Sequence, residues 1–185
     1  MFIIDLLSTN QEMVEQMTAV LHTAFHAHYP DAWPDMASAR AEVEEFFDPE
    51  RICRVAVADD GTVLGWVGAS REYNGRAWEL HPLVVHPDYQ GQGVGRALVA
   101  DLEAQVRARG GVTIFLGTDD EDNQTSLSNV DLYPNPLEHL SRIQNLNRHP
   151  FAFYQKAGFV IVGVIPDANG PGKPDILMAK RVSQE

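Results

Sequence analysis

The sequence predicts a mixed α/β domain whose central sheet is mostly antiparallel, contains one parallel strand pair and is flanked by helices. Two hairpin-type turns, Asp59-Asp60-Gly61 and Tyr73-Asn74-Gly75, separate apolar runs of strand length, which is typical of antiparallel neighbours. A helical repeat then connects the apolar runs at 78–85 and 112–117, and a helical crossover makes two neighbouring strands parallel. With 185 residues and no internal repeat, the chain is expected to form a single domain over residues 1–185.

The first seventy residues are expected to hold three strands and two helices. Residues 9–12 have the spacing of a capping box, which begins at Thr9, and apolar residues then follow at helical spacing to His26. A second helix is predicted to bury Phe46 and Phe47. The predicted elements are a strand at 1–7, a helix from the capping box to His26, a proline-broken loop at 28–35, a helix at 38–47, and strands at 51–58 and 63–70.

The remaining chain alternates strands and helices. Apolar residues repeat at helical spacing from Arg96 until Gly110 and Gly111, which are typical of a helix C-terminus. The other predicted elements are strands at 78–85 and 112–117, helices at 137–147 and 150–158, and strands at 159–165 and 176–179.

The charge of the chain limits its partners. Its net charge is −12, from 14 Lys and Arg against 26 Asp and Glu, which argues against nucleic acid and anionic membranes as partners. No apolar run approaches the ~20 residues that span a bilayer, and the N-terminus lacks the basic region of a signal peptide. We therefore expect a cytoplasmic protein.

Neither a disulfide nor a metal site is expected. Cys53 is the single cysteine, and it falls in a strand-like alternation that favours a core position. His22 and His26 stand four residues apart on the first helix, but no carboxylate partner accompanies them.

The stretch from Trp78 to Glu103 has the organisation of an anion-binding site. A strand is followed by a loop with Gly91, Gly93 and Gly95 and then by a helix. Glycines let the backbone approach an anion, and unpaired N–H groups at a helix start point towards it. The loop lacks the Lys-Ser/Thr of a P-loop and the glycine spacing of a dinucleotide site. Glycine spacing alone would also suit a tight connection between strand and helix.

The wider string Gln90-Gly91-Gln92-Gly93-Val94-Gly95 resembles the acetyl-CoA loop of the GNAT acetyltransferase superfamily. The resemblance implies a GNAT-type fold, in which the parallel strand pair surrounds the acetyl-CoA site. It also implies that the loop amides, helped by Arg96, hold the pyrophosphate of acetyl-CoA. Val84 and Val85 would then offer their backbone to the pantetheine arm.

Acetyl transfer to an amine requires that the amine lose a proton, the thioester carbonyl be polarised and the leaving thiolate be protonated. Glu79 and His81 share one face of a strand, so either side chain could accept the proton of the amine. Alternatively, Glu79 is simply an exposed strand residue, and His81 is a structural histidine. By the family resemblance, the strand bulges just past His81, and the Leu83 N–H faces the acetyl carbonyl. Tyr154 would protonate the thiolate, although an aromatic stripe is more often packing.

A second resemblance is narrower. Segments 78–85, 116–120, 149–156, 161–170 and 173–176 resemble aminoglycoside 6'-N-acetyltransferases. The implied acceptor is a rigid sugar with several ammonium groups, which carboxylates bind well. Asp119 and Asp120 are the motif-based candidates for that contact, and Trp33 and Asp35 are weaker ones. Similar enzymes are often homodimers, which we expect here too.

Two other functions remain open from the sequence. The acceptor could be another amine, such as a polyamine, a protein lysine or a protein N-terminus. A non-catalytic acyl-CoA-binding sensor would keep the glycine loop but would need neither Glu79 nor Tyr154.

Overall fold

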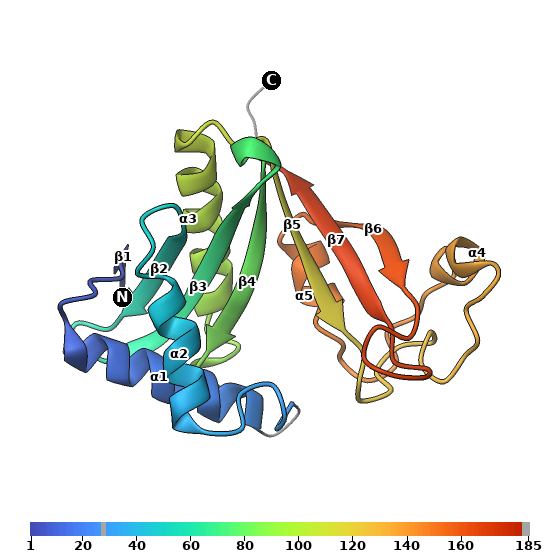
Figure 1. Cartoon of the computed structure of the whole chain (residues 1–185), viewed down its shortest axis with the longest axis horizontal. Helices are drawn as coiled ribbons and strands as arrows, with labels where there is room; N and C mark the ends of the chain where they lie inside the picture. Colours follow the sequence, from blue (N-terminus) through green and yellow to red (C-terminus); the bar gives the residue numbers. More distant parts are fainter. Residues whose placement is uncertain (27–28, 183–185) are drawn as a thin grey trace. The chain divides into compact units, whose positions relative to one another are not determined.

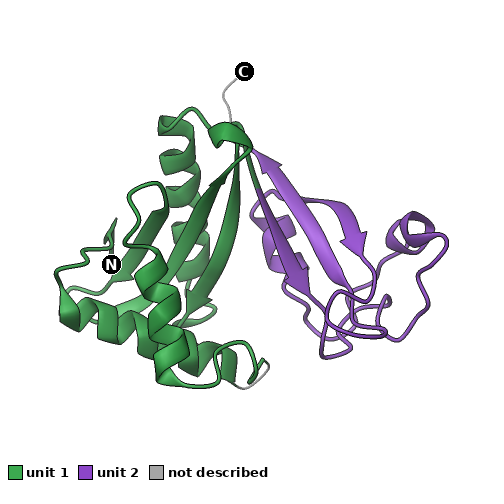
Figure 2. Ribbon diagram, in the orientation of Figure 1, with its two compact units in different colours: residues 1–114, 182–185 green, residues 115–181 purple. Residues whose placement is uncertain are grey.

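A computed structural model describes residues 1–26 and 29–182, and it divides the chain into two compact units (Figure 2). Unit 1 comprises Met1–Ile114 together with the chain end from Val182, and unit 2 comprises Phe115–Arg181. His28, where the predicted loop at 28–35 begins, lies outside the described residues. A single domain over the whole chain remains a prediction.

The strands form a seven-stranded sheet in the order β1-β2-β3-β4-β5-β7-β6. Their bounds are β1 Phe2–Asp5, β2 Ile52–Val57, β3 Val63–Glu72, β4 Ala77–Val85, β5 Thr113–Asp119, β6 Val160–Ile165 and β7 Asp175–Arg181. β1 to β4 pair antiparallel in succession, as do β6 and β7, whereas β4 and β5 are parallel. The predicted mixed, mostly antiparallel sheet with one parallel pair is therefore confirmed.

Helices cover both faces of the unit 1 strands (Figure 1). α1 (Gln11–His26) and α2 (Met36–Glu45) lie on one face, and α3 (Val94–Ala108) lies on the other. Unit 2 contains the shorter α4 (Pro136–Leu140) and α5 (Phe151–Lys156). Short 3-10 turns at Tyr73–Gly75 and Pro87–Tyr89 flank β4.

The core of unit 1 joins α1 and α2 to the sheet. Met17, Leu21 and Val43 are fully buried with Trp66 in one apolar cluster. The Trp66 indole Nε1 donates a hydrogen bond to the Met17 carbonyl at 3.2 Å, so its one polar group is satisfied. Among the described residues, no helix is both long and apolar enough to cross a bilayer.

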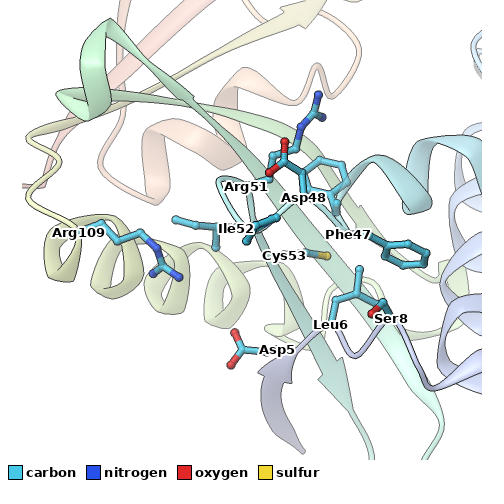
Figure 3. A pocket seen from close by; sticks show the side chains of 11 residues that line it. Asp5, Leu6, Ser8, Phe47, Asp48, Arg51, Ile52, Cys53 and Arg109 are labelled. Carbon is cyan, nitrogen blue, oxygen red and sulfur yellow. The ribbon is translucent and has the colours of Figure 1, made fainter.

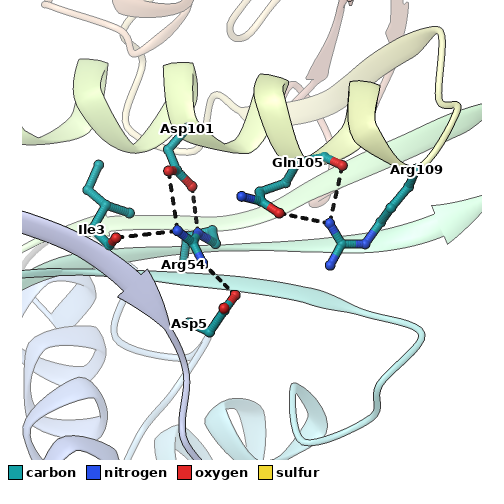
Figure 4. A network of polar contacts seen from close by, with 6 residues as sticks. All are labelled: Ile3, Asp5, Arg54, Asp101, Gln105 and Arg109. Carbon is teal, nitrogen blue, oxygen red and sulfur yellow. Dashed lines mark hydrogen bonds and ion pairs between the residues drawn. The ribbon is translucent and has the colours of Figure 1, made fainter.

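A buried arginine ties three elements of unit 1 together (Figure 4). Arg54 of β2 donates from Nε to Asp101 of α3 at 2.6 Å and from Nη1 to Asp5 of β1. Its Nη2 also donates to the Ile3 carbonyl at 3.3 Å. Since an unpaired buried charge is costly, the two carboxylates allow Arg54 to stay in the interior and hold α3 against the edge of the sheet.

Several element boundaries differ from the sequence prediction by a few residues, and three of the differences affect the roles of named residues. Asn10, rather than Thr9, accepts a hydrogen bond from the Met13 N–H at 3.1 Å and caps α1. α3 begins at Val94, so Gly95 belongs to its first turn and not to the loop before it. Phe47 is exposed because α2 ends at Glu45 and the chain turns there.

The helix predicted at 137–147 is wrong in its second half. α4 ends at Leu140, and Asn145 instead forms an isolated bridge with Thr125. Leu137 and Leu146 are exposed, so the leucine spacing does not mark a face that packs on a core in unit 2.

Candidate functional site

The centre of β4 carries the expected bulge. Val67 of β3 is paired with Leu83, but Ala69 is paired with Leu80, so His81 and Pro82 together oppose Gly68. A bulge re-aims the side chains around it and changes which backbone groups face a neighbour. Leu83, the candidate donor to an acetyl carbonyl, directly follows this irregularity.

Glu79 and His81 lie on one side of β4, as the alternation of the strand predicts. Trp78, Leu80 and Pro82 are buried, whereas Glu79 is half-buried and the His81 side chain is 60% exposed. Both candidate bases are therefore accessible to solvent or to a ligand.

His81 has two neighbours on the α2 side of unit 1. The Trp33 ring lies 6.0 Å from the His81 ring between centroids. Glu42 of α2 places Oε1 3.9 Å from His81 Nε2. The sequence predicts Trp33 as a site residue but not Glu42, because no local pattern separates Glu42 from Glu44 and Glu45 of the same helix.

Asp35 has a structural role at the start of α2. Its carboxylate accepts the Ser38 N–H at 2.8 Å, and the Ser38 hydroxyl accepts the Asp35 N–H, which completes a capping box. These bonds, first that from the Ser38 backbone, lower the pKa of Asp35 below its ordinary value. Its contact with an acceptor remains a prediction.

The glycine loop has the geometry that an anion requires. Gly91 and Gly93 adopt φ of +73° and +90°, which side chains rarely tolerate. No atom lies within 4 Å of where a Cβ would stand on either residue, so the backbone there is open to a close approach. Gly93 is the N-cap of α3 and makes no side-chain capping bond to its first turn.

Two glutamines brace this loop. Gln90 Nε2 donates to the Val85 carbonyl at 3.2 Å, and Gln92 Nε2 donates to the Asp88 carbonyl at 2.9 Å. The first-turn N–H groups of α3, at Val94, Gly95 and Arg96, lack intrahelical acceptors by their position. A braced loop, open glycines and a helix N-terminus fit the pyrophosphate of acetyl-CoA.

The two adjacent aspartates of unit 2 have different environments. Asp120 is 1% exposed, and its oxygens accept the N–H groups of Gln124 and Thr125, at 2.7 and 2.8 Å, and the Ser128 hydroxyl. Burial alone would raise the pKa of Asp120, but these bonds outweigh it and lower that pKa. Asp120 thus organises the loop after β5, and its contact with a substrate stays a prediction.

Asp119 is the last residue of β5 and is partly exposed. Asn169 Nδ2 donates to its carboxylate at 2.5 Å, which fixes the orientation of the side chain. His149 Nε2 lies 3.0 Å from the Asp119 carbonyl, and His149 Nδ1 accepts the Phe151 N–H at 3.2 Å. A neutral His149 with the proton on Nε2 satisfies both contacts.

Tyr154 lies on α5 between two aromatic rings of unit 2. Its ring makes edge contacts with Phe153 and Phe159, at centroid distances of 5.1 and 5.6 Å. A phenol is protonated at neutral pH even at its ordinary pKa of about 10, and burial raises the pKa of Tyr154 further. A proton donor requires that form.

A cavity of about 220 Å³ in unit 1 holds none of the predicted site residues (Figure 3). It is lined by Asp5, Leu6, Ser8, Phe46, Phe47, Asp48, Pro49, Arg51, Ile52, Cys53 and Arg109. Cys53 is buried as expected, and burial raises the pKa of its thiol, which makes it a poor nucleophile. Among the described residues, no group of three or more His, Cys, Asp or Glu side chains could hold a metal ion.

Comparison with known proteins decides the family. Residues 14–133 match the family model described as acetyltransferase (GNAT) family. The chain belongs to this family. Membership confirms the predicted family and fold class, together with an enzyme class that uses acetyl-CoA.

Among solved structures, aminoglycoside 6'-N-acetyltransferases are similar over the whole chain. One, complexed with coenzyme A, is 42% identical, with a TM-score of 0.90, and the match covers 100% of this chain and 99% of that one. A second, from Enterococcus faecium, is also 42% identical over 100% and 99% of the two chains, with a TM-score of 0.89.

Curated relatives of this GNAT chain carry other names. A mycothiol acetyltransferase of Propionibacterium freudenreichii is 28% identical over 87% of this chain, which spans 44% of that relative's length. The N-alpha-acetyltransferase RimI of Mycobacterium tuberculosis is 36% identical over 52% of this chain and 58% of its own.

Proposed function

We propose that this GNAT chain transfers an acetyl group from acetyl-CoA to the 6'-amine of aminoglycosides, directly between the two bound substrates. The observation that carries the proposal is the 42% identity to an aminoglycoside 6'-N-acetyltransferase over the full length of both chains. The mycothiol acetyltransferase is only 28% identical, and this chain spans 44% of its length.

The donor supplies an activated acetyl group as a thioester. The backbone N–H groups from Gly91 to Gly95, in the glycine loop and the first turn of α3, bind the pyrophosphate of this donor, with Arg96 as an added cation at the start of α3. Gln90 and Gln92 hold the loop in place. Val94 is buried at the start of α3 and adds its backbone N–H, and the backbone of Val84 and Val85 binds the pantetheine arm. This binding needs no generally basic surface, which agrees with a net charge of −12.

The proposed mechanism uses side chains for the two proton transfers and one backbone N–H to polarise the thioester carbonyl. Glu79 or His81 accepts the proton of the acceptor ammonium, directly or through water, since both lie on the accessible side of β4. The Leu83 N–H, placed after the bulge, donates to the acetyl carbonyl oxygen as charge develops there. The Tyr154 phenol gives its proton to the leaving sulfur.

The acceptor is bound through its positive charges. Asp119 is held in one orientation by Asn169 and remains partly exposed, which suits an ammonium ligand. Trp33 and Asp35 are further candidate contacts. Acetylation removes one positive charge from the drug, so this activity would confer antibiotic resistance. A homodimer and a cytoplasmic location remain predictions from the sequence.

The experiment measures thiol release from acetyl-CoA over aminoglycosides, polyamines and peptides with free N-termini. The proposal predicts a kcat/KM for aminoglycosides at least about 100-fold above that for the other classes, a difference of about 2.7 kcal/mol. Preference for peptide N-termini, as the name of the RimI relative suggests, would contradict it. An acyl-CoA-binding sensor would release no thiol with any acceptor.

A further inference from the structure

Glu42 is a carboxylate of unit 1 to which the sequence assigns no role. It is one of three glutamates in the second half of α2. Glu44 and Glu45 each pair with an arginine nitrogen, at 2.7 and 2.9 Å. Glu42 instead faces the candidate base His81, with its Oε1 3.9 Å from Nε2, and its side chain is 16% exposed. Glu44 and Glu45 are therefore paired with arginines, whereas the Glu42 carboxylate lies beside a candidate base.

Trp33 is the second neighbour of His81, and its ring is held in place by the core of unit 1. Its indole packs partly against the core of unit 1 and meets the Phe25 ring edge-on, at 4.8 Å between centroids and 78° between planes. The Trp33 and His81 rings are tilted by 34° at 6.0 Å. An aromatic ring fixed on one side and half-buried is a suitable platform for a ligand ring.

We propose that Glu42 binds an ammonium group of the acceptor, next to Trp33, whose indole covers the apolar face of the same amino-sugar ring. A carboxylate accepts charge-assisted hydrogen bonds from an ammonium, and the indole attracts the same cation through its ring face. The site lies beside His81, so a sugar bound there holds its reactive amine near the β4 bases. This inference rests on the proposed function for the identity of the acceptor.

Kinetics of Glu42→Gln in the full-length enzyme test the contact. For an aminoglycoside with several amino groups, KM should rise about tenfold while kcat stays within about twofold, because a charged hydrogen bond to the bound sugar is lost. For 6-amino-6-deoxyglucose, which offers only the reacting amine, KM should not change. Glu42→Asp should recover part of the lost affinity, since it keeps the charge.

Glu44→Gln is the matched control. It removes the same charge from the same helix, but Glu44 pairs with Arg40 on the exposed side of α2. Its KM values should match those of the wild type. The inference is overturned if Glu42→Gln leaves the aminoglycoside KM within twofold of the wild type, or if Glu44→Gln raises it equally.

Tryptophan fluorescence gives a readout that needs no turnover. The chain has three tryptophans, and Trp66 and Trp78 are 0% and 3% exposed. Trp33 is therefore the indole that an acceptor can touch in unit 1. Titration with an aminoglycoside should quench the fluorescence, Trp33→Phe should abolish the quench, and Glu42→Gln should raise its midpoint about tenfold. A quench that survives Trp33→Phe contradicts the inference.

The two proposals fail in different ways. If the wild type acetylates aminoglycosides but Glu42→Gln behaves like Glu44→Gln, the Glu42 contact is wrong and the function stands. If the wild type acetylates none, the function is wrong. A Trp33-dependent quench by a polyamine, weakened by Glu42→Gln, would then still support the binding site.

Discussion

Tyr154 has an environment that keeps its phenol protonated. Burial raises its pKa, and the flanking rings of Phe153 and Phe159 hold the side chain in place. Tyr154→Phe preserves those contacts and removes only the hydroxyl. We expect kcat to fall roughly 100-fold with KM nearly unchanged, the size typical of a lost acid catalyst, in steady-state assays with acetyl-CoA and an aminoglycoside.

Tyr73→Phe is the control for this substitution, because Tyr73 is exposed and lies in the turn before β4. It should leave both constants unchanged. A Tyr154→Phe enzyme with wild-type kcat would remove the phenol from the mechanism.

His149 makes the stability of the protein depend on pH. Burial lowers its pKa below the ordinary value of 6.5, so the unfolded chain takes up a proton before the folded protein does. The contribution of His149 to the free energy of unfolding is complete above about pH 6.5 and is lost as the pH falls through its folded-state pKa.

Thermal unfolding between pH 7.5 and 5 checks this expectation. The melting temperature of the wild type should drop more steeply below pH 6.5 than that of His149→Gln, which has no imidazole to protonate. His26→Gln, at an exposed histidine of α1, should keep the wild-type slope. Equal slopes for the wild type and His149→Gln would contradict the argument.

The attachment of α3 to the sheet depends on the Arg54 contacts shown in Figure 4. Asp101→Asn keeps the shape of the side chain but removes one of the two charges that compensate Arg54. We expect the free energy of unfolding to fall by about 1.5–3 kcal/mol, the range for hydrogen bonds to charged groups, since Asp101 is only 23% exposed. Chemical denaturation with urea measures it.

Glu50→Gln serves for comparison, since Glu50 pairs with Arg71 at the surface at 2.9 Å. Exposed ion pairs contribute about 0–1 kcal/mol, so this variant should be close to the wild type. If Asp101→Asn costs no more than Glu50→Gln, the network does not anchor α3.

The elements that the sequence predicts well are those whose signals are local. The turns at Asp59–Gly61 and Tyr73–Gly75 place β2 to β4 within two residues, because hairpin chemistry acts on neighbouring residues. The segment 137–147 has leucines at helical spacing, yet its second half bridges to Thr125. That pairing depends on distant residues, which periodicity cannot reveal.

The same distinction applies to the candidate site. The donor loop is continuous in sequence, so Gly91 and Gly93 could be recognised from it. Asp119 and Asp120 are adjacent and look equivalent, but only the fold turns Asp120 inward onto three donors. Glu42 of α2 comes close to His81 of β4 only in the folded chain, and no pattern at residue 42 indicates this.

At the scale of the whole molecule, unit 2 carries an exposed apolar strand. β6 is the last strand of the sheet order, and Val160, Val162 and Ile165 are 62%, 57% and 47% exposed. Natural proteins rarely leave such an edge uncovered, which supports the expected homodimer. Light scattering should give twice the chain mass of 20.5 kDa, and Val162→Glu should give a monomer.

Leu7→Glu is the control for the dimer, because Leu7 is an exposed apolar residue of unit 1. It should leave the mass unchanged. A monomeric wild type, or a Val162→Glu variant that stays dimeric, would contradict a dimer built on β6.

The proposed enzyme acetylates one amine of one class of drug. The direct test of this activity compares two aminoglycosides that are identical except that one has an amine at the 6' position and the other has a hydroxyl there. Mass spectrometry counts the acetyl groups on each product, and NMR locates them. We predict one acetyl group on the 6'-nitrogen of the first drug and none on the second. Acetylation of both drugs at a shared amine, or of neither, would contradict the account.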